Sequence, residues 1–202
     1  MASICALLDA MSSDSSPTRT KILAAARQLL EGGGQVRMSD IARAAGISRQ
    51  AVYLHFSTRA DLLVALTRWM DEVNEIDRLL APSRTAPDGP ARLDAWVAAW
   101  GSYIPKVHAV ARALMAMYET DAEARAAWDD RMAAMRDGCA AAVRALSADG
   151  CLRDDLSEQQ AIDLLWTLLS VRNWDHLCRD CGWSEEVYVT RMQDLARRAL
   201  CD

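Results

Sequence analysis

The stretch MSDIARAAGISRQAVYLHFSTRAD, residues 38–61, decides the fold of this chain. Its pattern predicts two short helices joined by a glycine turn. Ser39 is the expected N-cap of the first helix, and Gly46 is expected to end that helix in the left-handed conformation. Ser48 is expected to cap the second helix, with Ile47 before it as part of a hydrophobic staple. A helix, a glycine turn and a second helix are the parts of a module that reads DNA.

A third helix is expected to begin at the end of this stretch, where Thr58 and Asp61 have the spacing of a capping box. The helix before it should turn its polar side chains outwards. Arginine and glutamine read guanine and adenine edges, serine, tyrosine and histidine bond to phosphate oxygens, and helix starts favour phosphate. Arg49 and Gln50 are the candidate base readers; a solvated bundle face is the alternative, as is plain capping for Ser39 and Thr58. The candidate DNA contacts are Arg37, Ser39, Ser48, Arg49, Gln50, Tyr53, His55, Thr58 and Arg59.

Residues 16–69 resemble the N-terminal domain of the tetracycline-repressor-like (TetR) family of bacterial regulators. The similarity rests on a leading amphipathic helix TRTKILAAARQLLEGGG, on MSDIARAAGIS, and on QAVYLHFSTRADLLVAL with its Tyr-x-His-Phe core. The resemblance implies that Tyr53 and His55 are phosphate anchors. It also implies a homodimeric regulator, most often a repressor, which a small ligand releases from a palindromic operator in double-stranded DNA.

Charge is distributed unevenly along the chain. The formal net charge is −5, from 23 Lys and Arg against 28 Asp and Glu. Residues 17–66 carry seven basic and three acidic side chains, or +4, whereas residues 67–202 carry 16 basic and 23 acidic ones, or −7. A basic segment over residues 17–66 joined to an acidic body over residues 67–202 is typical of a protein in which one domain binds DNA.

The fold class expected for the whole chain is all-α, with about nine helices. Residues 1–16 should form a disordered tail, and residues 17–66 a three-helix helix-turn-helix domain. A long helix should join this domain to an α-helical ligand-binding and dimerisation domain over residues 67–202.

Helix boundaries in the rest of the chain are predicted from caps and prolines. The joining helix should run from Thr58 to about residue 80, and the proline-rich stretch 81–90 should be a loop. Thr120 and Ser157 are expected to open capping boxes. The remaining helices are expected over residues 90–103, 105–118, 120–148, 157–181 and 184–200.

Aromatic and methionine side chains are frequent in the predicted body. Trp96, Trp100 and Tyr103 follow at spacings of four and three, which places them on one face of a helix. The resemblance places that helix beside a ligand cavity, so an apolar, partly aromatic small molecule is the expected ligand. The alternative for each residue is ordinary core packing. The candidate ligand contacts are Trp96, Trp100, Tyr103, Met115, Tyr118, Trp128, Trp166 and Trp174.

The last two predicted helices carry apolar stripes that could pair with their copies in a four-helix dimer interface, the arrangement that the resemblance implies. The stripe residues are Ile162, Leu165, Leu169, Val187, Met192 and Leu195.

The segment HLCRDC, residues 176–181, leaves an alternative open, namely a thiol- or metal-responsive DNA-binding switch that uses Cys178 and Cys181. No second cysteine or histidine pair has ligand spacing, so no metal site and no cofactor is expected. A third hypothesis is an enzyme or architectural protein that merely contains the helix-turn-helix, but the catalytic patterns that would favour an enzyme do not occur. The lack of a long apolar run and of a basic leader predicts a cytoplasmic protein without a membrane partner.

Overall fold

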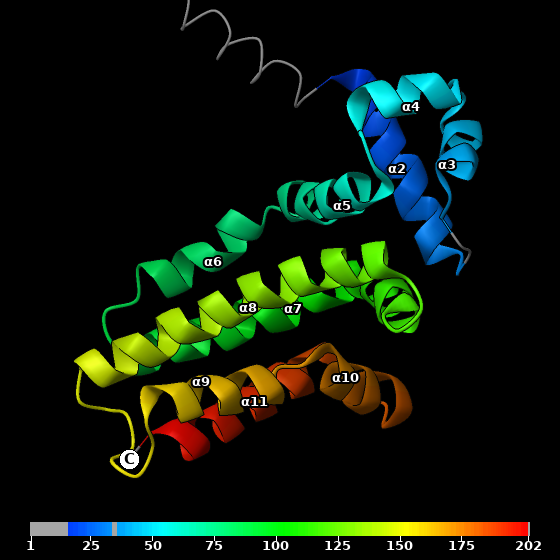
Figure 1. Ribbon diagram of the computed structural model, residues 1–202. Helices are drawn as coiled ribbons and strands as arrows, with labels where there is room; N and C mark the ends of the chain where they lie inside the picture. Colours follow the sequence, from blue (N-terminus) through cyan, green and yellow to red (C-terminus); the bar gives the residue numbers. More distant parts are fainter. Residues whose placement is uncertain (1–15, 34–35, 202) are drawn as a thin grey trace, which may run out of the picture. The chain divides into compact units, whose positions relative to one another are not determined.

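The computed structural model describes residues 16–33 and 36–201 (Figure 1). Apart from Ser16, the tail expected at residues 1–16 lies outside the described residues. Every element of regular secondary structure in the described residues is a helix, which confirms the predicted all-α fold class. None of these helices is both long and apolar enough to cross a membrane. In chain order the helices are α2 (Pro17–Glu31), α3 (Met38–Ala45), α4 (Arg49–His55), α5 (Arg59–Val73), α6 (Ile76–Arg84), α7 (Gly89–Met117), α8 (Ala122–Ala148), α9 (Glu158–Leu168), α10 (Val171–Trp174), a π-helix (Asp175–Asp180) and α11 (Glu185–Leu200).

The described chain forms two compact units. The first contains the residues up to Trp69 together with Arg112–Trp128. The second contains Met70–Ala111 and the chain from Asp129 onwards. Residues 112–128, which the sequence analysis assigned to the body, therefore pack with the first unit, so α5, α7 and α8 each contribute to both units.

The first unit is built around one face of each of its helices. α3 packs against both α2 and α4. The apolar residues of α3 recur at helical spacing and are almost fully buried. This burial accounts for most of the stability of so short a helix. The buried side chains of this core include Ile22, Leu23, Ala26, Leu30, Ile41, Val52, Phe56, Leu62, Leu63 and Leu66.

Three residues predicted to begin or end helices near α4 are confirmed in that role. Gly46 ends α3 with φ 66°, in the left-handed region that glycine enters without steric cost. The hydroxyl of Ser48 accepts a hydrogen bond from the N–H of Ala51 at 3.1 Å. Thr58 and Asp61 form both bonds of a capping box, at 3.0 and 3.1 Å. The end of α3, the start of α4 and the start of α5 are therefore fixed by local chemistry.

The predicted cap at Ser39 is wrong. α3 begins one residue earlier, at Met38, and Arg37 holds the N-cap position without a side-chain bond. Met38 is buried whereas Ser39 is exposed. Burial of Met38 in the core therefore outweighs the preference of serine for the cap position.

The predicted single joining helix is interrupted. The amide of Asn74 donates to the carbonyl of Met70 at 2.7 Å, and Glu75 has φ 52°, so the chain leaves the helix between α5 and α6. A side-chain bond of this kind competes with the next turn of the helix. The loop predicted over residues 81–90 is also wrong in its first half, because α6 continues through Pro82.

Two helices predicted on either side of Pro105 are one helix. α7 runs without a break from Gly89 to Met117. Tyr103, Ile104 and His108 around the proline are all buried. Packing on both sides of Pro105 offsets the cost of about 3 kcal/mol that a proline imposes on a helix interior.

The later helices also differ in detail from the prediction. Ser157 forms the predicted capping box. α8 is capped by Asp121 rather than Thr120, because the Asp121 carboxylate accepts the N–H of Ala124 at 3.1 Å. The helix expected over residues 157–181 is divided, since Ser170 caps the separate helix α10 and a π-helix follows it.

Candidate nucleic-acid interface

The two faces of α4 are as different as the sequence predicted. Val52 is fully buried, whereas Ser48, Arg49 and Gln50 are exposed and Tyr53 is 41% exposed. The packing side of the helix is therefore committed to the core. The polar side is available to a groove of DNA, which admits a single α-helix.

Arg49 and Tyr53 are paired one turn apart on this exposed face. The Arg49 guanidinium donates to the Tyr53 hydroxyl at 3.2 Å, and its Cζ atom lies 5.4 Å from the centre of the Tyr53 ring. Water screens an exposed pair of this type, so it contributes little to stability. The pair orients both side chains along α4 without preventing either from exchanging its partner for DNA.

Leu54 was missed by the sequence analysis. Its side chain is 81% exposed, and it follows Gln50 by four residues on the same face of α4. Helical spacing from Gln50 would have identified it, but the sequence analysis considered only polar side chains as DNA contacts. Leucine can contact the methyl group of thymine, which is the apolar mark in the major groove.

His55 lies in a hollow beside α4 with a volume of about 340 Å³. The hollow brings His55 close to Arg19 of α2, a residue that the sequence analysis did not select. Arg19 stacks its guanidinium over Phe56 at 5.1 Å from the ring centre. The lining residues are Arg19, Leu54, His55, Phe56, Ser57, Asp61 and Ala65.

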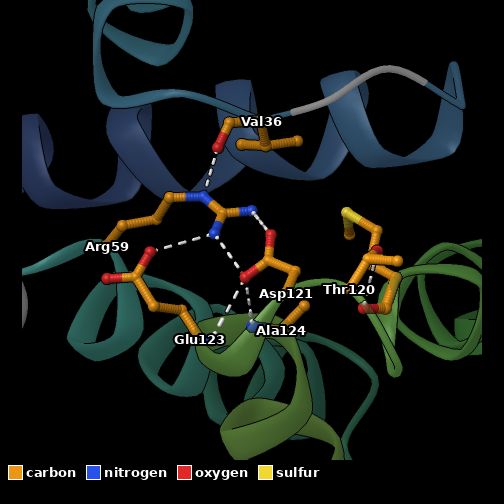
Figure 2. A network of polar contacts seen from close by, with 7 residues as sticks. Val36, Arg59, Thr120, Asp121, Glu123 and Ala124 are labelled. Carbon is orange, nitrogen blue, oxygen red and sulfur yellow. Dashed lines mark hydrogen bonds and ion pairs between the residues drawn. The ribbon is translucent and has the colours of Figure 1, made fainter.

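The candidates at helix starts fall into two groups. Arg37, Ser39 and Thr58 are exposed, although the hydroxyl of Thr58 is already used in its capping box. The side chain of Arg59, in contrast, is only 14% exposed. Figure 2 shows its guanidinium turned towards Asp121 and Glu123. This position does not suit a phosphate contact.

The eight candidate ligand contacts are divided between the two units. Met115, Tyr118 and Trp128 belong to the first unit, whereas the other five belong to the second. Tyr118 is occupied there by Arg125, whose Cζ atom lies 5.2 Å from the ring centre. The candidates of the second unit are Trp96, Trp100, Tyr103, Trp166 and Trp174.

Tyr103 in the second unit has a structural partner. Its hydroxyl donates to the Asp71 carboxylate, which also pairs with Arg131. Burial, followed by the hydrogen bond to Asp71, raises the pKa of Tyr103 above its ordinary value. Tyr103 therefore stays neutral and links α7 to the last turn of α5.

Buried polar atoms without a partner occur in the second unit. By strict hydrogen-bond geometry they are the indole N–H groups of Trp96, Trp100 and Trp174 and the hydroxyl of Tyr188. Trp96 nevertheless interacts with the Cys139 thiol, and Trp100 with the Tyr188 hydroxyl, so the indole of Trp174 is the group left without an acceptor among the described residues. An unpartnered buried donor costs about 1–3 kcal/mol. Trp174 also lies against His108, at 4.6 Å between ring centres, and His108 Nε2 is 2.8 Å from Asp175.

The HLCRDC segment forms the π-helix and its end, and its geometry gives no support to a thiol or metal switch. Burial and the nearby Glu185 carboxylate raise the pKa of Cys178, which lowers the thiolate fraction that reactivity requires. Cys181 Sγ lies 3.9 Å from His176 Nε2. Among the described residues no group of three or more His, Cys, Asp or Glu side chains could hold a metal ion.

Comparison with known proteins identifies the segment that contains this interface. Residues 22–66 match the family model described as bacterial regulatory proteins, tetR family. The match covers α3, α4, most of α2 and the first half of α5. Among curated proteins, none matches the chain.

Solved structures share the fold of the whole chain. A transcriptional regulator from Saccharomonospora viridis in complex with choline has a TM-score of 0.70 at 22% identity, over 91% of this chain and 97% of that one. The regulator FadR from Bacillus subtilis in complex with stearoyl-CoA has a TM-score of 0.71 at 17% identity, over 88% and 96%. NalD, the secondary repressor of the MexAB-OprM efflux pump in Pseudomonas aeruginosa, has a TM-score of 0.66 at 22% identity, over 91% and 96%.

Proposed function

We propose that this chain, which belongs through residues 22–66 to the tetR family of bacterial regulatory proteins, represses transcription by holding a palindromic operator as a homodimer. The observation that carries the proposal is the exposed face of α4, fixed between the caps at Ser48 and Thr58 and lying within the family match. Gln50 and Leu54 form its base-reading stripe, together with Arg49. The phosphate contacts are assigned to Tyr53, His55, Ser48, Ser39, Arg37 and Thr58.

The proposal is tested by selecting binding sites from random DNA with the full chain. A homodimer should recover a palindrome whose half-sites lie roughly one helical turn, ~34 Å, apart or somewhat further. Footprinting then locates the protein on the selected site. Recovery of sequences without two-fold symmetry would contradict the palindromic reading.

Leu54 should give a sharp signature on the selected site. Replacing the contacted thymine by deoxyuracil removes only its methyl group and should weaken binding by the wild-type protein about fourfold, by analogy with a buried CH2 group worth ~0.8 kcal/mol. Leu54→Ala should be insensitive to that replacement. Quantitative binding at fixed salt measures both effects. If no replacement of thymine by deoxyuracil in the site weakens binding by the wild-type protein, Leu54 does not belong to the base-reading stripe.

The homodimer is supported by apolar side chains at the surface of the second unit. Leu164 on α9 and Val187 and Leu195 on α11 are 44–46% exposed, and α9 and α11 pack side by side (Figure 1). Four of the predicted stripe residues are instead buried within one chain, which corrects that part of the prediction. These core residues are Ile162, Leu165, Leu169 and Met192.

The ligand is proposed to enter the second unit and to carry hydrogen-bond acceptors on an apolar body. Support comes from the buried indole N–H of Trp174, which has no acceptor within the described residues of the second unit, because an indole N–H can only donate. The similar folds described in complex with choline and with stearoyl-CoA show that this architecture accommodates small molecules of different chemistry. A carboxylate or carbonyl on an alkyl chain would meet both requirements.

A pair of probes with matched alkyl chains tests the ligand class. Laurate carries acceptor oxygens, whereas dodecyltrimethylammonium carries none. Laurate should bind about tenfold more tightly, because a hydrogen bond to a buried donor contributes roughly 1–1.5 kcal/mol. Titration below the micellar concentrations, followed by tryptophan emission, measures both affinities. Tighter binding of the ammonium compound would reverse the proposed chemistry.

A further inference from the structure

Arg59 contacts two separate segments of the first unit, the one before α3 and the start of α8 (Figure 2). Its Nε donates to the carbonyl of Val36. Its two Nη atoms lie 3.0 and 2.9 Å from the two carboxylate oxygens of Asp121, and Nη1 is also 3.0 Å from Glu123. Two-point pairing of a guanidinium with a carboxylate fixes orientation as well as distance.

The carboxylate of Asp121 contacts both α8 and Arg59 of α5. Its Oδ1 accepts the N–H groups of Glu123 and Ala124, each at 3.1 Å, and so caps α8. The same oxygen accepts a hydrogen bond from Arg59. The hydrogen bond from Arg59 is the largest of the effects that lower the pKa of Asp121, so the pair remains ionised at neutral pH. The first turn of α8 is thereby tied to the first turn of α5.

The contacts of Arg59 lie at the two ends of the helix-turn-helix, the segment proposed to bind DNA. Val36 lies two residues before α3, and Arg59 lies four residues after the last residue of α4. The Arg59 guanidinium therefore joins the start of the helix-turn-helix to its end. A contact that closes the ends of this segment restricts its conformations before DNA binds, which reduces the entropy lost on binding.

We propose that Arg59, Asp121 and Glu123 form an ion-pair clamp that positions α3 and α4 for the operator, without any of the three touching DNA. The proposal rests on the proposed function, since it concerns the reading of DNA. Arg59 offers five N–H groups, and the contacts to Val36, Asp121 and Glu123 use most of them. A phosphate would have to compete with two carboxylates already in place.

The clamp is tested by Arg59→Gln, Asp121→Asn and the double variant. Asparagine caps helices as well as aspartate does, so Asp121→Asn removes the charge and keeps the cap. Each single variant should bind the selected operator roughly tenfold more weakly, within the range of coupling between sites. The double variant should be no weaker than either single one, because both changes remove the same interaction. Glu119→Gln, which removes a charge from an exposed neighbouring residue, should bind as the wild type does.

The salt dependence of binding separates the clamp from a phosphate contact. The slope of log K against log salt should be unchanged in both single variants, because no phosphate contact is lost. A slope reduced by about one in Arg59→Gln, with normal binding by Asp121→Asn, would make Arg59 a phosphate contact and overturn the clamp. Additive losses in the double variant would also overturn it.

Hydrogen exchange without DNA distinguishes failure of the clamp from failure of the proposed function. The amides of α3 and α4 should exchange faster in both single variants than in the wild type, whatever DNA the protein binds. Unchanged exchange in α3 and α4 would refute the clamp. A wild type that selects no DNA sequence would refute the proposed function alone, and the exchange measurement would still decide on the clamp.

Discussion

The variant with Leu164→Glu and Leu195→Glu should sediment as a monomer at micromolar concentration, whereas the wild type should sediment as a dimer. Both leucines are 46% exposed in one chain and lie on neighbouring helices. Burying a leucine in an interface contributes about 1.5–3 kcal/mol, and a two-fold interface would lose each leucine twice. Two glutamates on each protomer would further place like charges opposite one another.

Loss of the dimer should lower affinity for the palindrome by about 10²–10⁴-fold, because the α4 helix of the second protomer would no longer be held at high effective concentration near its half-site. Affinity for an isolated half-site should change little, since α4 lies in the other unit. Val73→Glu is the matched control, because Val73 is 48% exposed but belongs to α5. A double variant that remains dimeric would place the interface elsewhere.

Local rules account for the parts of the fold that the sequence predicted well. The turn at Gly46 and the caps at Ser48 and Thr58 depend on residues within four positions of one another. The exposed face of α4 follows from the same short-range periodicity. These features lie in the segment that matters most for DNA binding.

The failures have both local and long-range causes. The break at Glu75 follows from the local side-chain bond of Asn74 to Met70, whereas the continuity of α7 through Pro105 depends on packing that periodicity does not reveal. Arg59 has the same limitation, because Asp121 and Glu123 are 62 and 64 residues away in sequence. A basic residue at a helix start looks like a phosphate contact until its partners are known.

Gly138→Ala should lower the free energy of unfolding by about 1–3 kcal/mol, the usual cost of overpacking a core. Replacing glycine by alanine inside a helix ordinarily stabilises by roughly 0.5–1 kcal/mol, so the sign of the effect is informative. A Cβ atom at Gly138 would lie 2.0 Å from the Trp96 ring, a separation that real Cβ contacts essentially never show. Trp96 is almost fully buried against α8, which leaves its rigid ring little room to move.

Trp96→Phe should rescue Gly138→Ala, because the smaller ring vacates the space that the new methyl group needs. The double variant should therefore be more stable than the sum of the two single changes predicts, with a coupling of about 0.5–3 kcal/mol. Urea unfolding of the four proteins measures this cycle. Gly32→Ala is the control, because its Cβ would meet no atom closer than 3.4 Å, which is ordinary van der Waals contact. If Gly138→Ala proves as stable as the wild type, the Trp96 ring moves readily, and that mobility would favour Trp96 as a ligand contact over a fixed core residue.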